Sequence, residues 1–152
     1  MRIAVGSDHA GFPLKTPLAA WLREMGHEVV DLGTHSTDSV DYPLIGFELA
    51  RQVAEGAAER GVLVCGSGIG VSIAANRVEK ARAALVNEPL SARLAREHND
   101  ANIVCMGSRL VGEEMAREIV RVFLDTPFAG GRHQRRIDQL DQHALAAPTE
   151  ER

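Results

Sequence analysis

Two segments of the chain combine glycines with residue types that could do chemistry. Cys65 is followed by residues 66–70, Gly-Ser-Gly-Ile-Gly, so that three glycines lie within five residues. Such a turn lets the backbone approach a ligand closely, and its amides can bind an anion. Asp8 and His9 likewise follow a short apolar run and precede Gly11. A thiol, a carboxylate and an imidazole therefore occur beside turns that could hold a small anionic substrate.

The glycine turn after Cys65 fails three familiar patterns. A dinucleotide fingerprint needs a further glycine and normally follows the first strand, whereas Val71 stands here after the third expected strand. A cysteine phosphatase loop would need arginine at position 71, and a P-loop would need Gly-Lys-Ser/Thr. What remains is a cysteine beside an amide-lined anion hole. The structural alternatives stay open: Asp8 could only cap a helix, and Cys65 could only fill the core.

A basic segment, residues 130–136, lies late in the chain and contains Arg132, His133, Arg135 and Arg136. If this segment is helical, the spacing of Arg132 and Arg136 places both on one side of the helix. Two guanidinium groups on one face suit the binding of a phosphate. A solvated surface is the alternative interpretation of such a run.

The elements that must position these residues alternate along the chain. Apolar runs predict strands at 3–5, 28–32, 61–65, 82–86 and 103–106, and helical spacing predicts helices between them and after the last, at 113–123. This alternation predicts an α/β fold: a three-layer Rossmann-like sandwich in which helices cover both faces of a five-stranded parallel sheet. In such folds, ligands bind beyond the carboxyl ends of the strands, which is where Asp8 and Cys65 would lie.

The composition is that of one ordinary globular domain. The chain has 152 residues, with 17 Lys plus Arg against 21 Asp plus Glu, and 45% of its residues are apolar. These values argue against disorder, and a mildly acidic chain argues against general nucleic-acid binding. The sequence predicts a single domain over 1–144 and a tail over 145–152 that frays.

Cysteine usage and hydropathy lead us to expect a soluble, cytoplasmic protein. Cys65 and Cys105 both lie in apolar runs with no short-spaced metal pattern, so neither a disulfide framework nor a metal site is expected. No run approaches the ~20 apolar residues of a membrane helix. The acidic residue Asp8 lies too close to the N-terminus to leave room for the apolar segment of a signal peptide.

Taken together, these segments resemble ribose-5-phosphate isomerase type B, a family that also includes the subunits of galactose-6-phosphate isomerase. The resemblance runs from residue 2 to about 141 and rests on Asp8-His9-Ala-Gly11, Asp41-Tyr42-Pro43, Cys65-Gly-Ser-Gly-Ile-Gly70, Ala74-Ala-Asn76, Glu97-His-Asn-Asp100, Gly107-Ser-Arg109 and Gly130-Gly-Arg-His-Gln-Arg-Arg136. It implies interconversion of an aldose phosphate and a ketose phosphate, most simply D-ribose 5-phosphate and D-ribulose 5-phosphate, through a cis-enediolate. It also implies no metal and no organic cofactor.

The resemblance further implies the catalytic roles. Family members use either the cysteine of the glycine turn or a glutamate at the position of Val71 as base, so this chain resembles the cysteine kind. Cys65 would move a proton between C1 and C2, and Ser67 would relay a proton. Asp8 would hold a sugar hydroxyl or assist proton movement between O1 and O2. His98 would be the acid–base group for ring opening.

Substrate binding is assigned in the same way. His9, Arg132 and Arg136 would bind the phosphate, with Arg109 and Asn99 as further polar contacts. Tyr42 would contact the sugar. Backbone amides of the turn that holds Gly66, Gly68 and Gly70 would stabilise the enediolate.

Topology adds an expectation about assembly. Cys65 ends a strand, whereas His98 follows a helix, 89–97, that returns the chain to the opposite edge of the sheet over ~13 Å. His98 and Asn99 can then share a sugar with Cys65 only if they come from a partner subunit. We therefore expect an obligate homodimer with two composite sites, in some cases paired into a tetramer.

Several alternatives remain open from the sequence. The substrate could be another aldose phosphate, such as allose 6-phosphate, galactose 6-phosphate or a tetrose phosphate. The chain could instead be a phosphate-binding module without chemistry, for which the thiol of Cys65 would be dispensable. It could also be a non-catalytic subunit of a hetero-oligomeric isomerase, although the joint presence of Cys65, Asp8, His98 and both arginines argues against that.

Overall fold

Five short strands form one parallel sheet in the computed structural model, which describes residues 1–145. The strands are β1 (Arg2–Ser7), β2 (Glu28–Asp31), β3 (Arg60–Cys65), β4 (Ala83–Leu85) and β5 (Ile103–Gly107), in the spatial order β2-β1-β3-β5-β4. The three central strands, β1, β3 and β5, are buried almost throughout because helices cover both faces of the sheet. The predicted five-stranded parallel sheet is confirmed.

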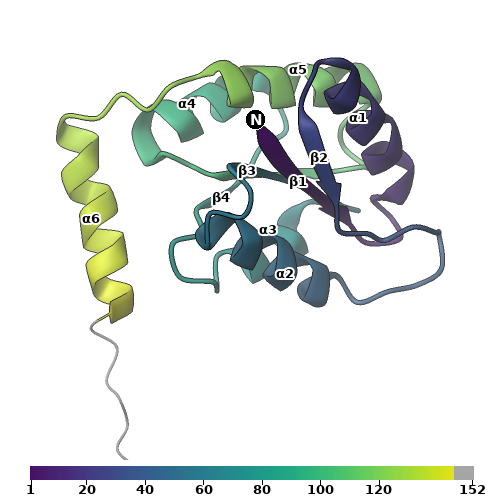
Figure 1. Cartoon of the computed structure of the whole chain (residues 1–152), viewed down its shortest axis with the longest axis horizontal. Helices are drawn as coiled ribbons and strands as arrows, with labels where there is room; N and C mark the ends of the chain where they lie inside the picture. The colour runs from purple at the N-terminus through teal and green to yellow at the C-terminus, as the bar shows by residue number, and fades with distance from the viewer. Residues whose placement is uncertain (146–152) are drawn as a thin grey trace, which may run out of the picture.

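Two helical layers enclose this sheet (Figure 1). One layer holds α1 (Phe12–Glu24), α4 (Pro89–Asn99) and α5 (Glu113–Asp125), and the other holds α2 (Tyr42–Ala54) and α3 (Ile69–Ala75). Each layer buries its own apolar cluster against the sheet, around Phe123 and Ile119 on the first face and around Leu49 and Leu63 on the second. The Rossmann-like three-layer sandwich is thereby confirmed.

A sixth helix, α6 (Arg132–Leu145), stands apart from this sandwich at the far side of α4 (Figure 1). From the sequence, a helix here is considered only as a condition for the basic segment, and the structure shows that the helix continues beyond that segment to Leu145. Among the side chains described on α6, only His133 and Ile137 are buried. Of the expected frayed tail, 145–152, only Leu145 belongs to the described residues, as the last residue of α6. Within the described part of the chain, no helix combines the length and apolarity needed to cross a membrane.

The turns at the carboxyl edge of the sheet are packed backbone against backbone. A Cβ atom added at Gly11 would lie 2.3 Å from the carbonyl oxygen of Val64, and one at Gly107 would lie 2.6 Å from the carbonyl carbon of Ser67. The hydroxyl of Ser108 also donates a hydrogen bond of 2.7 Å to the carbonyl oxygen of Ala10. The turns that follow β1, β3 and β5 therefore hold one another in place.

Candidate active site

A shallow hollow opens where β1 and β3 end. It contains residues from four segments far apart in the sequence and is lined by Asp8, His9, Ala10, Tyr42, Cys65, Gly66, Ser67, Gly70 and Arg109. The structure therefore brings together most of the residues predicted for the site at the carboxyl edge, as expected for an open α/β sheet. A second hollow, which shares Asp8, His9 and Tyr42, continues towards residues 39–44.

Cys65 lies at the floor of this hollow with 4% of its surface exposed. Its Sγ atom accepts a hydrogen bond of 3.1 Å from the amide of Gly68. That donor stabilises negative charge on the sulfur, which is the state in which a thiol acts as a base or nucleophile. Gly68 adopts a φ of +78°, a left-handed conformation that suits glycine, so the sequence allows the turn to aim this amide back at the sulfur.

The other cysteine, Cys105, lies on the adjacent strand β5 and is fully buried. Both cysteines are free thiols, as the sequence predicts. Burial raises the pKa of the Cys105 thiol strongly, and the nearby Cys65 adds to this effect. Cys105 therefore stays a neutral core residue, while Cys65 is the thiol that faces the hollow.

Close backbone approach orients two further side chains. A Cβ atom at Gly70 would lie 2.8 Å from the ring of Tyr42, so the aromatic ring packs directly on the glycine turn. A Cβ atom at Gly66 would lie 3.2 Å from Cζ of Arg109, which places the guanidinium group over this part of the turn. A larger residue at position 70 would displace the Tyr42 ring, and one at position 66 would crowd the Arg109 guanidinium.

The carboxylate of Asp8 and the imidazole of His9 are each held by a backbone amide. Oδ1 of Asp8 accepts a hydrogen bond of 2.9 Å from Gly11, so this carboxylate does order the turn before α1. Nδ1 of His9 accepts one of 3.2 Å from Val40. In the neutral ring this bond leaves the proton on Nε2, which is then available as a donor.

Two amides of the glycine turn are engaged within the turn itself. The amide of Gly68 bonds the sulfur of Cys65, and the amide of Ile69 donates to Oγ of Ser67 across 3.3 Å. Helix α3, which follows, has 7 residues, so it brings little more than its first-turn amides to the hollow. Within the described residues, no group of three or more His, Cys, Asp or Glu side chains is arranged to hold a metal ion.

His98 and Asn99 lie at the opposite edge of the sheet from Cys65. They end α4, which has 11 residues and so runs about 16 Å back towards the amino ends of the strands. The chain then enters β5 through Asn102, whose Oδ1 accepts a hydrogen bond of 2.8 Å from the amide of Arg82, the residue before β4. The expected separation of His98 from the Cys65 of its own chain is confirmed.

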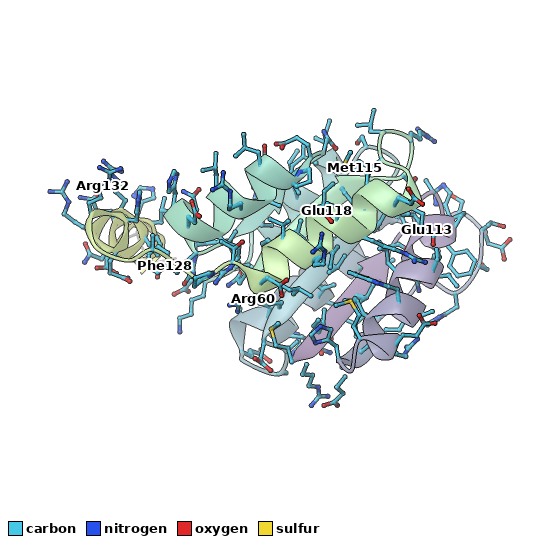
Figure 2. The ribbon with its side chains drawn as sticks, turned by 90° about the horizontal axis from the view of Figure 1, so that it is seen from above. Arg60, Glu113, Met115, Glu118, Phe128 and Arg132 are labelled. Atoms are coloured by element: carbon cyan, nitrogen blue, oxygen red, sulfur yellow. The ribbon has the colours of Figure 1, made fainter. Side chains whose placement is uncertain are left out.

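Arg132 and Arg136 are exposed on α6, on the His98 side of the molecule. Figure 2 shows Arg132 at one end of the view and Glu113, which starts α5 at the carboxyl edge of the sheet, towards the other. Because residues 132–136 belong to α6, Arg132 and Arg136 lie one turn apart on one side of this helix, as the spacing predicts. One chain thus carries two separate groups of predicted site residues, one around Cys65 and one around His98.

Sequence reasoning left His133 without a role. Its ring lies parallel to that of His98, with ring centroids 4.5 Å apart and an interplanar angle of 16°. The connection into α6 is fixed by a hydrogen bond of 3.1 Å from the amide of Ala129 to the carbonyl oxygen of Glu97. In the sequence, the only indication of this contact is that His133 lies among the arginines and one helical turn before Ile137.

The fold and the hollow together define a class: a Rossmann-like α/β protein with a free thiol in a glycine-lined cleft for a small polar ligand. A family model described as Ribose/Galactose Isomerase matches residues 3–140. The chain belongs to this ribose/galactose isomerase family.

Several relatives cover nearly the whole chain. It is 47% identical to ribose-5-phosphate isomerase B of Escherichia coli (strain K12) over 91% of this chain and 93% of that protein. It superposes on ribose-5-phosphate isomerase B of Clostridium thermocellum with a TM-score of 0.94 at 46% identity, covering 95% of this chain and 98% of that one. It is also similar to ribose-5-phosphate isomerase B of Mycoplasma genitalium with bound ribulose-5-phosphate, with a TM-score of 0.93 at 40% identity, covering 96% of this chain and 97% of that one.

Proposed function

We propose that the chain is a cytoplasmic aldose–ketose isomerase that interconverts D-ribose 5-phosphate and D-ribulose 5-phosphate. The observation that carries this proposal is the thiol of Cys65, which lines a glycine-rich hollow together with Asp8 and His9. Relatives at 40–47% identity are named for this reaction, and one of them has been solved with ribulose-5-phosphate bound.

Cys65 acts as the base that serves both carbons. Its thiolate takes the proton from C2 of the open-chain aldose, which leaves a cis-enediolate across C1 and C2, and returns a proton to C1. Meanwhile a proton is gained at O1 and lost at O2. The hydrogen bond from Gly68 supports this role because it stabilises the thiolate before Sγ takes the C2 proton and again after it has returned a proton to C1.

The remaining groups of the hollow stabilise the enediolate and hold the sugar. The hydroxyl of Ser67 relays a proton, and the carboxylate of Asp8, already oriented by Gly11, holds a sugar hydroxyl or assists transfer between O1 and O2. Tyr42 packs on the turn beside the sugar. His9 offers its Nε2–H to the phosphate, and Arg109 adds a charged contact from above Gly66.

The second group completes the site from a partner subunit. His98 acts as acid and base in opening the furanose ring, Asn99 adds a polar contact, and Arg132 and Arg136 bind the phosphate. Each chain of a homodimer then lends this group to its partner, which gives two equal sites. A pair of such dimers forming a tetramer is compatible with the same sites.

An apolar surface beside the glycine turn supports this assembly. Ile69, Ile73 and Leu85 are 50%, 54% and 39% exposed. Ile69 and Ile73 lie one turn apart on α3, and a Cβ atom at Gly68 would lie 2.7 Å from Leu85. Burial of these three side chains by a second copy would bring that copy directly beside Cys65.

Purified protein assayed against a panel of aldose phosphates tests the proposal. Ribose 5-phosphate, allose 6-phosphate, galactose 6-phosphate and erythrose 4-phosphate are compared by kcat/KM for ketose formation. We expect the highest value for ribose 5-phosphate. A higher value for another sugar would change the substrate, and activity with none of them would favour a binding module or a non-catalytic subunit.

A further inference from the structure

The stacked pair of His98 and His133 joins the two helices that carry the second group of site residues. His98 belongs to the last turn of α4 and His133 to the first turn of α6. At 4.5 Å between centroids and 16° between planes, one face of His98 is covered by His133. His98 is exposed, whereas His133 is 9% exposed, so the covering ring is the fixed partner of the two.

Ring opening makes strict demands on an imidazole. The group must take the proton from the O1 hydroxyl and supply a proton to the ring oxygen O4 as the C1–O4 bond breaks and its electron pair moves to O4. One ring can do both only if its nitrogens are aimed at the sugar in a fixed plane. A histidine at an exposed helix end has free side-chain rotation unless a neighbour restricts it.

We propose that His133 is a positioning residue for ring opening: by stacking on His98, it fixes the plane in which His98 meets the sugar. This inference rests on the proposed function. Both rings belong to the same chain, so the pair travels together to whichever site His98 serves. Ile137, one turn further along α6 and 4% exposed, anchors the helix that carries His133.

The charges around the pair are consistent with this role. Burial lowers the pKa of His133, and His98, Arg132 and Arg136 lower it further. His133 therefore stays neutral where an ordinary histidine begins to take up a proton. A neutral His133 adds no positive charge against the face of His98 on which it stacks.

Two variants of His133 and two reactions test the inference. His133→Phe keeps a flat ring that can stack, and His133→Ala removes it, while Gln134→Ala changes the exposed neighbouring residue as a control. Ribose 5-phosphate must be opened before it isomerises. Ribulose 5-phosphate has no free C5 hydroxyl to close a furanose ring, so deuterium uptake from solvent at its C1 bypasses ring opening.

We expect His133→Ala to lower kcat for ribose 5-phosphate by roughly 10- to 100-fold, as a misplaced catalytic group does, and to change deuterium uptake by less than about twofold. His133→Phe should restore most of kcat, and Gln134→Ala should match the unaltered protein. In NMR spectra, the ring protons of His98 should lose their ring-current shift in the alanine variant and keep it in the phenylalanine variant.

Three results would overturn the inference: an unchanged kcat in His133→Ala, an equal loss in both reactions, or a phenylalanine variant as defective as the alanine variant. Each differs from failure of the proposed function. If the unaltered protein converts neither sugar phosphate, the function itself is wrong. If it converts both and His133→Ala remains fully active, only the positioning role is wrong.

Discussion

The amide of Gly68 donates a hydrogen bond to Sγ of Cys65 across 3.1 Å, and both residues belong to the same turn after β3. The base proposed for isomerisation and the donor that supports its charge are therefore fixed relative to each other by local backbone geometry. No movement of a distant loop is needed to bring them together. Replacement of Cys65 therefore removes the proposed base without changing the turn that carries it.

Replacement of the base should stop the chemistry and spare binding. We expect Cys65→Ala to lower kcat by about 10²–10⁴-fold, because the reaction loses its positioned base. Deuterium uptake at C1 of ribulose 5-phosphate should fall equally, while calorimetry should still detect binding of the sugar phosphate. Rapid exchange in this variant would show that another group removes the proton.

A thiol-directed reagent provides the matching control. Iodoacetamide should modify Cys65 and not Cys105, because burial raises the pKa of Cys105 and removes it from solvent. Substrate should slow the modification, and mass spectrometry of peptides identifies the labelled residue. The Cys65→Ala protein should take up no label while folded.

The arginines of α6 should act on the phosphate and not on the sugar. We expect Arg132→Ala or Arg136→Ala to raise KM for ribose 5-phosphate by about 10- to 150-fold, since loss of a charged hydrogen-bond partner costs about 1.5–3 kcal/mol. KM for unphosphorylated ribose should barely change. Arg135→Ala, on the same exposed helix, is the matched control. Equal effects on both sugars would identify the arginines as surface residues.

Mixed dimers should recover activity that neither parent has. Cys65→Ala and His98→Ala proteins each lack one half of every site, but a mixed dimer contains one site with both halves intact. After subunit exchange, verified by mass spectrometry of intact dimers, we expect up to about one quarter of the unaltered activity from random pairing of equal amounts. Continued inactivity despite verified exchange would place both halves of the site in one chain.

Docking of α6 should weaken in acid. The pKa of His133 is lowered in the folded protein, so the unfolded segment binds more protons and stability rises with pH. The contribution is present above the ordinary histidine pKa of about 6.5 and is lost as the pH falls from there towards the lowered value. Hydrogen-exchange protection of the Ile137 amide at pH 7.5 and 5.5 measures this. His133→Phe should remove the difference, and protection that rises in acid would contradict the assignment.

The sheet and the Cys65 turn were predictable because local signals define them. Apolar runs of three to five residues that alternate with helical patterns are typical of strands covered on both faces, and three glycines within five residues mark the turn after Cys65. The separation of Cys65 from His98 could also be predicted from the sequence, because a helix that follows a parallel strand must run back to the opposite edge of the sheet.

Helix α6 and the histidine pair were not predictable in the same way. Ile137 and Leu140 lie at helical spacing on α6, but Leu140 is 60% exposed and the described side chains bury only His133 and Ile137, so the apolar stripe that marks a packed helix is short. Where it lies depends on the turn at Gly130 and Gly131, which have φ values of +64° and +57°. The direction of such a turn is set by contacts such as the bond from Ala129 to Glu97, which no spacing in the sequence reveals.

The backbone packing at the carboxyl edge limits how this chain can diverge. At Gly11 and Gly107 an added methyl group would meet main-chain atoms 2.3 Å and 2.6 Å away, and main chain, unlike a side chain, has no other rotamer to adopt. A saturation scan should therefore find both glycines as intolerant as Cys65, although neither takes part in the chemistry. Changes of substrate preference during evolution would then be confined to side chains around the hollow, such as those of residues 39–44, while the frame beneath them stays fixed.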